Sequence, residues 1–287
     1  MQNINSIVTD KTAFTQITSG IANMPKRLWL MGNLPQNRRP SVTIVGTRKP
    51  TPYGREVTYR FSYELAKRGI VIISGLALGV DGIAHQAALD AGGTTIAVLP
   101  TSLSAISPRS HHELARRIVE NGGALLSEYG PNDGIFKGNF IARNRIITAL
   151  SDGVLITEAT TRSGTLSTAN FALNQGKPVM AIPGNITSPM SAGCNSLLRT
   201  GATPALDIAD VLHELGLADV GEQASLPLAN NADEQALLRL LKQGTSEGEL
   251  LQQKSGLSAA TFSQTLTMLE IEGKIRALGA NQWAIRK

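Results

Sequence analysis

The sequence is poor in residues on which several classes of protein depend. It contains one cysteine, Cys194, which excludes an internal disulfide and a cysteine-based metal cluster. No apolar run approaches the roughly 20 residues needed to span a bilayer. The start of the chain, MQNINSIVTDKTAF, lacks the basic and then apolar build of a secretory signal. We therefore expect a cytoplasmic protein that has no membrane partner.

Aromatic residues are scarce as well, at 4% of the chain, which argues against base stacking along a long nucleic-acid groove. The net charge is +5, but no long segment concentrates it. Residues 1–40 carry five Lys and Arg and one acid, whereas residues 41–215 carry fifteen and thirteen. Residues 216–231 carry no Lys or Arg and two acids, and residues 232–287 carry seven Lys and Arg and six acids. Binding to a polyanion would therefore require a local cluster of cations.

Continuous apolar runs recur along the chain, with helix-like stretches between them. Such runs lack polar alternation because both faces of a parallel sheet are covered. The predicted strands are SVTIVG (41–46), IVIISG (70–75), TTIAVLP (94–100), ALLSE (124–128), GVLITEA (153–159) and KPVMAIPG (177–184). The predicted helices between them include residues 54–69, 79–93 and 110–123. This alternation predicts a doubly wound α/β domain from about residue 40 to residue 215.

The composition changes after this domain. Residues 216–231, GLADVGEQASLPLANN, are small, acidic and contain proline, which is typical of a linker. Residues 232–287 show three helical segments and then KIRALGANQWAIRK, a predicted two-stranded wing, and this order indicates a winged-helix domain. Its third helical segment, SAATFSQTLTMLEIEG, contains no Lys or Arg. We therefore expect a protein-interaction or regulatory module rather than a reader of duplex DNA.

Several predicted strands end in glycine, serine or threonine, at the edge of an open α/β sheet where ligands bind. Glycine lets backbone N–H groups approach an anion, and hydroxyl groups add donors, so these loops together suggest a phosphate-binding rim. Each loop alone is explained more simply as a tight turn. The small residues concerned are Gly46, Thr47, Ser74, Gly75, Ser163, Gly164 and Thr165, with Gly184 after the sixth strand.

Two familiar kinds of site are missing from these loops. The loop GTRKPTPYG lacks the G-x-G-x-x-G spacing of dinucleotide-binding folds, and the chain has no G-x-x-x-x-G-K-[ST] motif. His111 and His112 are not spaced as metal ligands, and no residue set suggests acid/base catalysis. We therefore expect no cofactor, no metal and no catalytic residue.

Cations accompany the rim. Arg48 follows the first predicted strand, Arg162 follows the fifth, and Arg143 and Arg145 lie in the expected opening turn of a helix. The N-terminal end of a helix disfavours cations, so we interpret this pair as the position of an incoming phosphate. Positions two apart point about 200° away from each other on a helix. We expect Arg143 to reach the ligand and Arg145 to brace the loop, while Phe140 stacks on a base or packs in the core.

Six motifs occur in the order found in the DNA-processing protein A family, also called DprA or Smf, and the chain resembles that family over about residues 24–215. The motifs are VTIVGTRKPTPYG, VIISGLALGVDGIAH, ALLSEYG, FIARNRIITALSDGVLITEA, RSGTLSTANFALNQGKPVMAIPGN and GCNSLLRTGA. The winged-helix pattern at residues 232–287 also matches the usual tail of the family. The resemblance implies an extended Rossmann-like domain with a mostly parallel sheet, followed by a small winged-helix domain.

The resemblance also implies a function without catalysis. A member of this family binds single-stranded DNA with little sequence preference, protects incoming strands and forms a homodimer. It loads a RecA-type recombinase onto those strands during natural transformation. By position, the resemblance assigns DNA binding to Gly46, Thr47, Arg48, Arg143, Asn144, Arg145, Ser163, Gly164 and Thr165.

The chain departs from the family pattern in three places. Ile141 follows Phe140 where the family usually has proline, and the loop after the third strand reads PTSLSAISPRS, in which Arg109 adds a cation. Many members carry a helical domain before the core. Residues 1–23 are too few for that module, so we expect an N-terminal tail in its place.

Two other functions remain open from the sequence. A nucleotide phosphoribohydrolase of the LOG type would need the motif P-G-G-x-G-T-x-x-E, but here Thr168 stands where the catalytic glutamate belongs. Glu158 is the only nearby carboxylate, and we expect it to cap or orient a loop. The other alternative is a domain that senses a small phosphorylated nucleotide.

Overall fold

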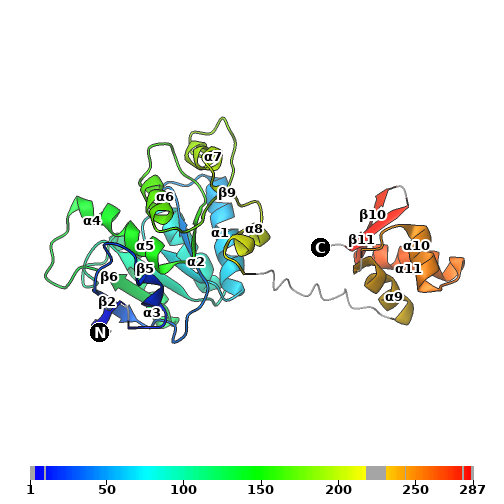
Figure 1. Cartoon of the computed structure of the whole chain (residues 1–287), viewed down its shortest axis with the longest axis horizontal. Helices are drawn as coiled ribbons and strands as arrows, with labels where there is room; N and C mark the ends of the chain where they lie inside the picture. The colour runs from blue at the N-terminus through cyan, green and yellow to red at the C-terminus, as the bar shows by residue number, and fades with distance from the viewer. Residues whose placement is uncertain (1–3, 10, 218–230, 243, 280, 286–287) are drawn as a thin grey trace. The chain divides into compact units, whose positions relative to one another are not determined.

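The computed structural model describes the chain except residues 1–3, 10, 218–230, 243, 280 and 286–287. The chain divides into two compact units, residues 1–217 and residues 218–287 (Figure 1). Most of the predicted linker at 216–231 therefore lies outside the described residues. No helix among the residues that the structure describes combines the length and the apolar character needed to cross a bilayer.

The larger unit is built on a nine-stranded sheet with the order β1-β2-β6-β5-β4-β3-β7-β8-β9. Its strands are β1 (Asn5–Val8), β2 (Arg27–Gly32), β3 (Ser41–Val45), β4 (Val71–Ser74), β5 (Thr95–Leu99), β6 (Ala124–Ser127), β7 (Gly153–Ile156), β8 (Val179–Ala181) and β9 (Thr203–Pro204). Its helices are η1 (Thr15–Thr18), α1 (Pro52–Lys67), α2 (Val80–Asp90), η2 (Arg109–His111), α3 (His112–Glu120), α4 (Lys137–Ala142), α5 (Asn144–Leu150), α6 (Gly164–Asn174), α7 (Ala192–Arg199) and α8 (Ile208–Glu214).

The sheet confirms the predicted fold. The six strands expected from apolar runs are observed as β3 to β8, and β3 to β9 pair in parallel with one another. β1 and β2 join the β6 edge in antiparallel orientation. The chain order runs outward from β3 through β4, β5 and β6, then returns to the other side of β3 with β7. This reversal between β3 and β7 is the point at which doubly wound folds bind their ligands.

Helices cover both faces of the sheet, which explains the continuous apolar runs. On one face, Val42 and Ile44 of β3 pack with Phe61 of α1 and Ala84 of α2, and α8 extends this layer. On the other face, Ile73 of β4 packs with the α5 side chains. α6 and α7 continue that second layer against β7 and β8. Alternate residues of each strand therefore belong to different cores, and both cores are apolar.

The N-terminal segment corrects one expectation. The sequence predicts residues 1–23 to be a tail, but Asn5–Val8 form β1, which pairs with β2. Phe14, next to η1, is fully buried against the core that contains Leu28 and Ile147. A hydrophobic side chain of this size favours burial by about 2–3 kcal/mol, which holds the segment on the domain.

The smaller unit confirms the helix–helix–helix–wing order of a winged-helix domain. Its elements are α9 (Ala232–Lys242), α10 (Gly248–Ser255), α11 (Ala259–Ile271), β10 (Ile275–Gly279) and β11 (Gln282–Ile285). β10 and β11 pair in antiparallel orientation as the wing. Leu237, Leu251 and Phe262 belong to a separate apolar core. This unit therefore has its own hydrophobic cluster, as an independent domain requires.

Candidate nucleic-acid interface

The loops at the carboxyl ends of the parallel strands form the edge where the sequence predicts a rim. The β3 loop and the β7 loop are adjacent because their strands pair across the point of reversal. They are also tied together, since the Thr47 N–H donates to the Glu158 carbonyl oxygen at 2.7 Å. Gly46 packs closely in this junction, where a Cβ would lie 2.7 Å from the Glu158 carbonyl oxygen. Gly46 and Thr47 thus shape the loop that presents Arg48.

The usual anion position of a doubly wound fold, at the start of α1, is filled from within the protein. The carboxylate of Glu158, which is 2% exposed, accepts from the Thr51 N–H at 2.8 Å and from the Thr51 hydroxyl at 2.6 Å. Gly54 leaves space for it, because a Cβ there would lie 2.2 Å from Glu158 Oε2. A negative charge at a helix N-terminus is favourable. Thr51 is the N-cap of α1 and accepts from the Gly54 N–H at 3.1 Å, so Glu158 orients the capping residue, as one of its two predicted roles requires.

Arg143 does not lie on the surface where the sequence predicts it. It is 5% exposed, and its Nη1 donates to the carbonyl oxygens of Gly75, at 2.7 Å, and Val98. Gly75 directly follows β4 and Val98 is the penultimate residue of β5, so the guanidinium joins the carboxyl-terminal parts of two neighbouring strands. Burial lowers the pKa of Arg143 to about 10, while the Asp81 carboxylate acts in the opposite direction. Arg143 is therefore a structural residue, which corrects its predicted contact with a ligand.

The local backbone explains why the two arginines separate. Arg143 is the N-cap residue of α5, where α4 ends, and Arg145 lies in the first turn of α5, so the predicted helix opening is observed. Arg145 points to Glu128, and its Nη2 lies 2.7 and 2.8 Å from the two carboxylate oxygens. The bracing role predicted for Arg145 is confirmed. Asn144 accepts from Arg143 Nε at 3.2 Å, so it orients the buried arginine.

Ser74 and Gly75 are also internal. Ser74 is fully buried, and its hydroxyl donates to the Ile44 carbonyl oxygen at 2.7 Å. The Gly75 N–H donates to Asp81 Oδ2 at 3.1 Å. Their polar groups are satisfied within the protein, so the sequence-based assignment of these two residues to the ligand is corrected. Their hydrogen bonds instead fix the loop after β4 to β3 and to the start of α2.

Arg48 and Phe140 meet at the surface. The guanidinium carbon of Arg48 lies 5.9 Å from the centre of the Phe140 ring, in the range of a cation–π contact. Arg48 is exposed and Phe140 is partly exposed. The ring of Phe140 is therefore not buried in the core, which was one of its two predicted roles. Its other predicted role, stacking on a base, stays a prediction.

The remaining predicted residues lie on exposed loops or at a helix start. Arg109 begins η2, and Arg162 lies in the β7 loop just before α6; both are exposed. Ser163 caps α6 by accepting from the Thr165 N–H at 3.1 Å. Thr165 is only 6% exposed, whereas Gly164 is exposed and has open space around it. This loop therefore offers Arg162 and the Gly164 backbone more readily than the two hydroxyl groups.

Two further cations lie at this edge that the sequence patterns did not single out. Lys49 directly follows Arg48, and Lys137 begins α4, three residues before Phe140; both are exposed. The sequence could have indicated both residues, because Lys49 and Lys137 lie within three positions of the predicted site residues Arg48 and Phe140. Within the described part of the chain, five exposed side chains at these loops form no ion pair, namely Arg48, Lys49, Arg109, Lys137 and Arg162.

Four carboxylates near these cations are engaged within the protein. Glu128 is paired with Arg145, Glu158 holds the Thr51 cap of α1, and Asp81 accepts from backbone N–H groups of the loop after β4. Asp133, which is exposed, accepts from the Gly130 N–H at 2.6 Å. Burial raises the pKa of Asp81, against the lowering effect of Arg143. The edge therefore presents unpaired positive charge, which is the local cluster that polyanion binding requires. We name this set of five cations together with Phe140 the cationic edge.

Two family models match the chain. One, described as DNA recombination-mediator protein A, matches residues 5–216, and the other, described as the DprA winged helix domain, matches residues 221–281. The protein Smf of Escherichia coli is 44% identical over 191 residues, which cover 67% of this chain and 51% of that protein. The DNA processing protein DprA of Streptococcus pneumoniae is 41% identical over 196 residues, which cover 68% of this chain and 69% of that protein.

Solved structures agree with these matches. The structure of DNA processing protein A from Streptococcus pneumoniae gives a TM-score of 0.69 at 39% identity and covers 74% of this chain and 75% of that one. A structure of DNA processing protein A from Helicobacter pylori, described in terms of its single-stranded DNA binding mode, gives 0.65 at 37% identity and covers 75% and 98%. The chain spans about half the length of the Escherichia coli relative and about two thirds of that from Mycobacterium tuberculosis. The resemblance in the motifs is thus confirmed: the chain belongs to the DNA recombination-mediator protein A family.

Proposed function

We propose that this protein binds single-stranded DNA at the cationic edge and acts as a binding protein, without catalysis. The observation that carries the proposal is the contrast between unpaired and engaged charges. The five exposed cations have no ion-pair partner in the described residues, whereas Glu128 is paired with Arg145 and Glu158 and Asp81 are buried and hydrogen-bonded. The Helicobacter pylori relative, whose structure concerns single-stranded DNA binding, supports the same polymer as ligand.

Binding at this edge rests on phosphates and one aromatic ring. Arg48, Lys49 and Arg162 extend from the adjacent β3 and β7 loops and contact successive phosphates. Phe140 offers a face for one base, beside the positive charge of Arg48. Phosphate contacts release counterions, so affinity falls steeply with salt, and they carry little sequence information. The expected ligand is a flexible single strand, because its bases are free to stack.

The family membership extends this proposal to partners. The protein protects incoming strands and forms a homodimer, and it loads a RecA-type recombinase onto the bound strand during natural transformation and recombination. The description of the family as a recombination mediator supports this role. A DNA strand-exchange assay in the presence of a single-strand-binding competitor tests it. We expect the protein to shorten the lag before exchange, and light scattering to give the mass of a dimer.

An enzymatic alternative has little support in the geometry. Thr168, at the position of the LOG-type glutamate, is 2% exposed and carries no acid group. Glu158 is held by Thr51 at the start of α1. Incubation of the protein with AMP is therefore expected to release no adenine, and measurable release would favour the phosphoribohydrolase.

The central experiment compares single-stranded and duplex DNA of one sequence in gel-shift competition across a range of salt concentrations. We expect a preference for the single strand and an affinity that falls as salt rises. Equal affinity for the duplex, or an affinity independent of salt, would contradict binding through phosphates and free bases. The variant Arg48→Ala locates the binding at the cationic edge.

A further inference from the structure

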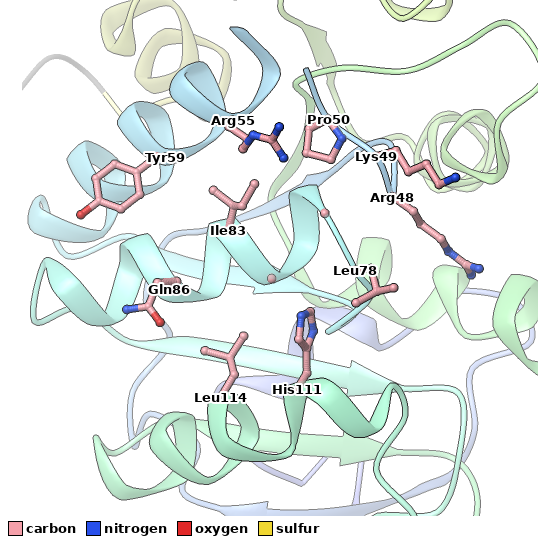
Figure 2. A pocket seen from close by; sticks show the side chains of 12 residues that line it. Arg48, Lys49, Pro50, Arg55, Tyr59, Leu78, Ile83, Gln86, His111 and Leu114 are labelled. Atoms are coloured by element: carbon pink, nitrogen blue, oxygen red, sulfur yellow. The ribbon is translucent and has the colours of Figure 1, made fainter. Parts of the chain in front are cut away.

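A cavity of about 820 Å³ adjoins the cationic edge at Arg48. It lies between α1, α2 and the segment of η2 and α3, and Figure 2 shows side chains from all of these elements around it. Arg48 lines the cavity and also contacts Phe140, which belongs to the edge. The cavity is therefore continuous with the proposed binding surface.

The lining of the cavity combines apolar and cationic side chains. Leu78 lies in the loop just before α2, Ile83 lies in the first turns of α2, and Leu114 comes from α3 (Figure 2). Lys49 and Arg55 add positive charge on the side of the β3 loop and α1. None of its twelve lining residues is an aspartate or a glutamate. An anion with an apolar body complements such a surface.

Two side chains on α1 are well suited to such a ligand. Arg55 is exposed, and its guanidinium group forms no ion pair within the described residues. Tyr59 is 41% exposed, and its ring stacks on Tyr63 with a centroid distance of 6.1 Å and an interplanar angle of 16°. Its hydroxyl lies 3.2 Å from Asp90 Oδ2. Tyr59 thus presents a ring that is already held in place at the cavity wall.

The opposite wall is fixed as well. His111 Nδ1 lies 2.9 Å from the carbonyl oxygen of Leu76, which can only accept, so Nδ1 donates. The imidazole packs on Gly82, where a Cβ would lie 2.6 Å from His111 Cε1. A side chain at position 82 would therefore displace His111. The cavity wall is formed by positions held in place rather than by loose surface side chains.

We propose that this cavity binds a nucleotide of the same single strand beyond the segment that lies on the cationic edge. The base lies against Ile83, Leu78 and Tyr59, and its phosphate is contacted by Arg55 and Lys49. The volume lies within the ~300–1,000 Å³ typical of small-ligand sites. This inference rests on the proposed function, because it extends the path of the strand past Arg48.

The test uses the full chain and labelled oligo(dT) of increasing length, with affinity measured by fluorescence anisotropy. For the unaltered protein we expect affinity to rise with length until the strand fills both the edge and the cavity. Arg55→Ala should weaken the long oligonucleotides about threefold to tenfold and lower the salt slope by about one, because one phosphate contact is lost. Affinity for oligonucleotides short enough to occupy the edge alone should not change.

Arg60→Ala is the matched control, because Arg60 is an exposed arginine of α1 that does not line the cavity. If Arg55→Ala and Arg60→Ala behave alike at every length, the cavity assignment is overturned while the proposed function stands. If Arg48→Ala leaves affinity unchanged at every length, the proposed function itself fails. A third outcome is that the protein binds free dTMP, that Arg55→Ala abolishes this binding, and that the same variant leaves the affinity for the strand unchanged. That outcome would overturn the assignment of the cavity to the strand.

A second measurement does not depend on any variant. Oligo(dT) containing 4-thiothymidine is photocrosslinked to the full chain, and the attached peptides are identified by mass spectrometry. Crosslinks to the α1 peptide that contains Tyr59 or to the start of α2 support the proposed path. Crosslinks confined to the segment around Phe140 and to the β7 loop overturn it.

Discussion

Gly75 leaves the space in which the guanidinium group of Arg143 lies, because a Cβ at position 75 would be 2.5 Å from Arg143 Nη2. The same arginine donates to the Gly75 carbonyl oxygen at 2.7 Å. Contact and hydrogen bond together lock the β4 loop onto the junction between α4 and α5. The pair of arginines that draws attention in the sequence is therefore engaged within the protein, and the proposed DNA contacts fall to Arg48 and its exposed neighbours.

Gly75→Ala is expected to destabilise the protein by about 1–3 kcal/mol, because the added methyl group overlaps a buried guanidinium and displaces it from the two carbonyl oxygens to which it donates. The free energy of unfolding in urea measures this. Gly138→Ala is the matched control, since Gly138 is exposed and nothing lies within 4 Å of the position that a Cβ would take there. Equal stability of both variants would contradict the tight contact.

Arg48→Ala is expected to cost about 1–3 kcal/mol of single-strand binding and to lower the salt slope by about one, with the melting temperature unchanged. Arg48 is exposed and contacts Phe140 only through its cation, so its loss leaves the core intact. Titration of a labelled oligonucleotide at several salt concentrations is the measurement. Arg143→Ala should instead lower stability by about 2–3 kcal/mol, because two carbonyl groups lose a charged donor.

Glu158→Gln is expected to lower the free energy of unfolding by about 1.5–3 kcal/mol. An amide cannot accept from both the Thr51 N–H and the Thr51 hydroxyl with its two ends, as the carboxylate does. Glu128→Gln provides the comparison, because its pair with Arg145 is partly exposed and an exposed pair contributes about 0–1 kcal/mol. A smaller effect at position 158 than at position 128 would argue against the role of Glu158 in holding Thr51.

His85 is expected to make the protein less stable as the pH falls. It is fully buried, and burial lowers its pKa from 6.5 to about 3. Below about pH 6.5 the unfolded chain binds this proton while the native protein does not, so stability is lost as the pH falls from 6.5 toward 3, by up to ~1.4 kcal/mol per pH unit. The free energy of unfolding in urea is measured for the protein and for His85→Gln between pH 4 and pH 7. If the two free energies depend on pH in the same way, His85 does not make this contribution.

Removal of residues 218–287 is expected to leave most of the single-strand affinity in place. The third helix of the smaller unit, α11, contains no Lys or Arg, and the cationic edge lies wholly in the larger unit. Binding isotherms of the shortened and full chains on the same oligonucleotide make the comparison. A loss of more than about tenfold, or ~1.4 kcal/mol, would show that the winged-helix domain contributes directly.

Some features of the site follow from local sequence. The glycine-containing loops after the strands and the cations Arg48 and Arg162 are evident from the chain alone, because carboxyl ends of parallel strands share one edge. The opposite directions of Arg143 and Arg145 also follow, since helical geometry separates positions two apart. Other features depend on partners far along the chain. The pairing of β1 with β2 and the burial of Phe14 lie in a segment with no strong periodicity, so the sequence predicts only a tail there.

By itself the sequence determined the doubly wound fold, the separate winged-helix domain and the sheet edge at which the glycine-containing loops gather. These depend on apolar patterning and on strand–helix alternation, which are local and periodic. Only the tertiary structure decided which arginine is buried, because that depends on whether the carbonyls of Gly75 and Val98 converge on it. It also decided that Glu158 fills the start of α1 and that a cavity opens beside Arg48. Burial and pairing arise from contacts between distant segments, and those contacts exist only once the chain has folded.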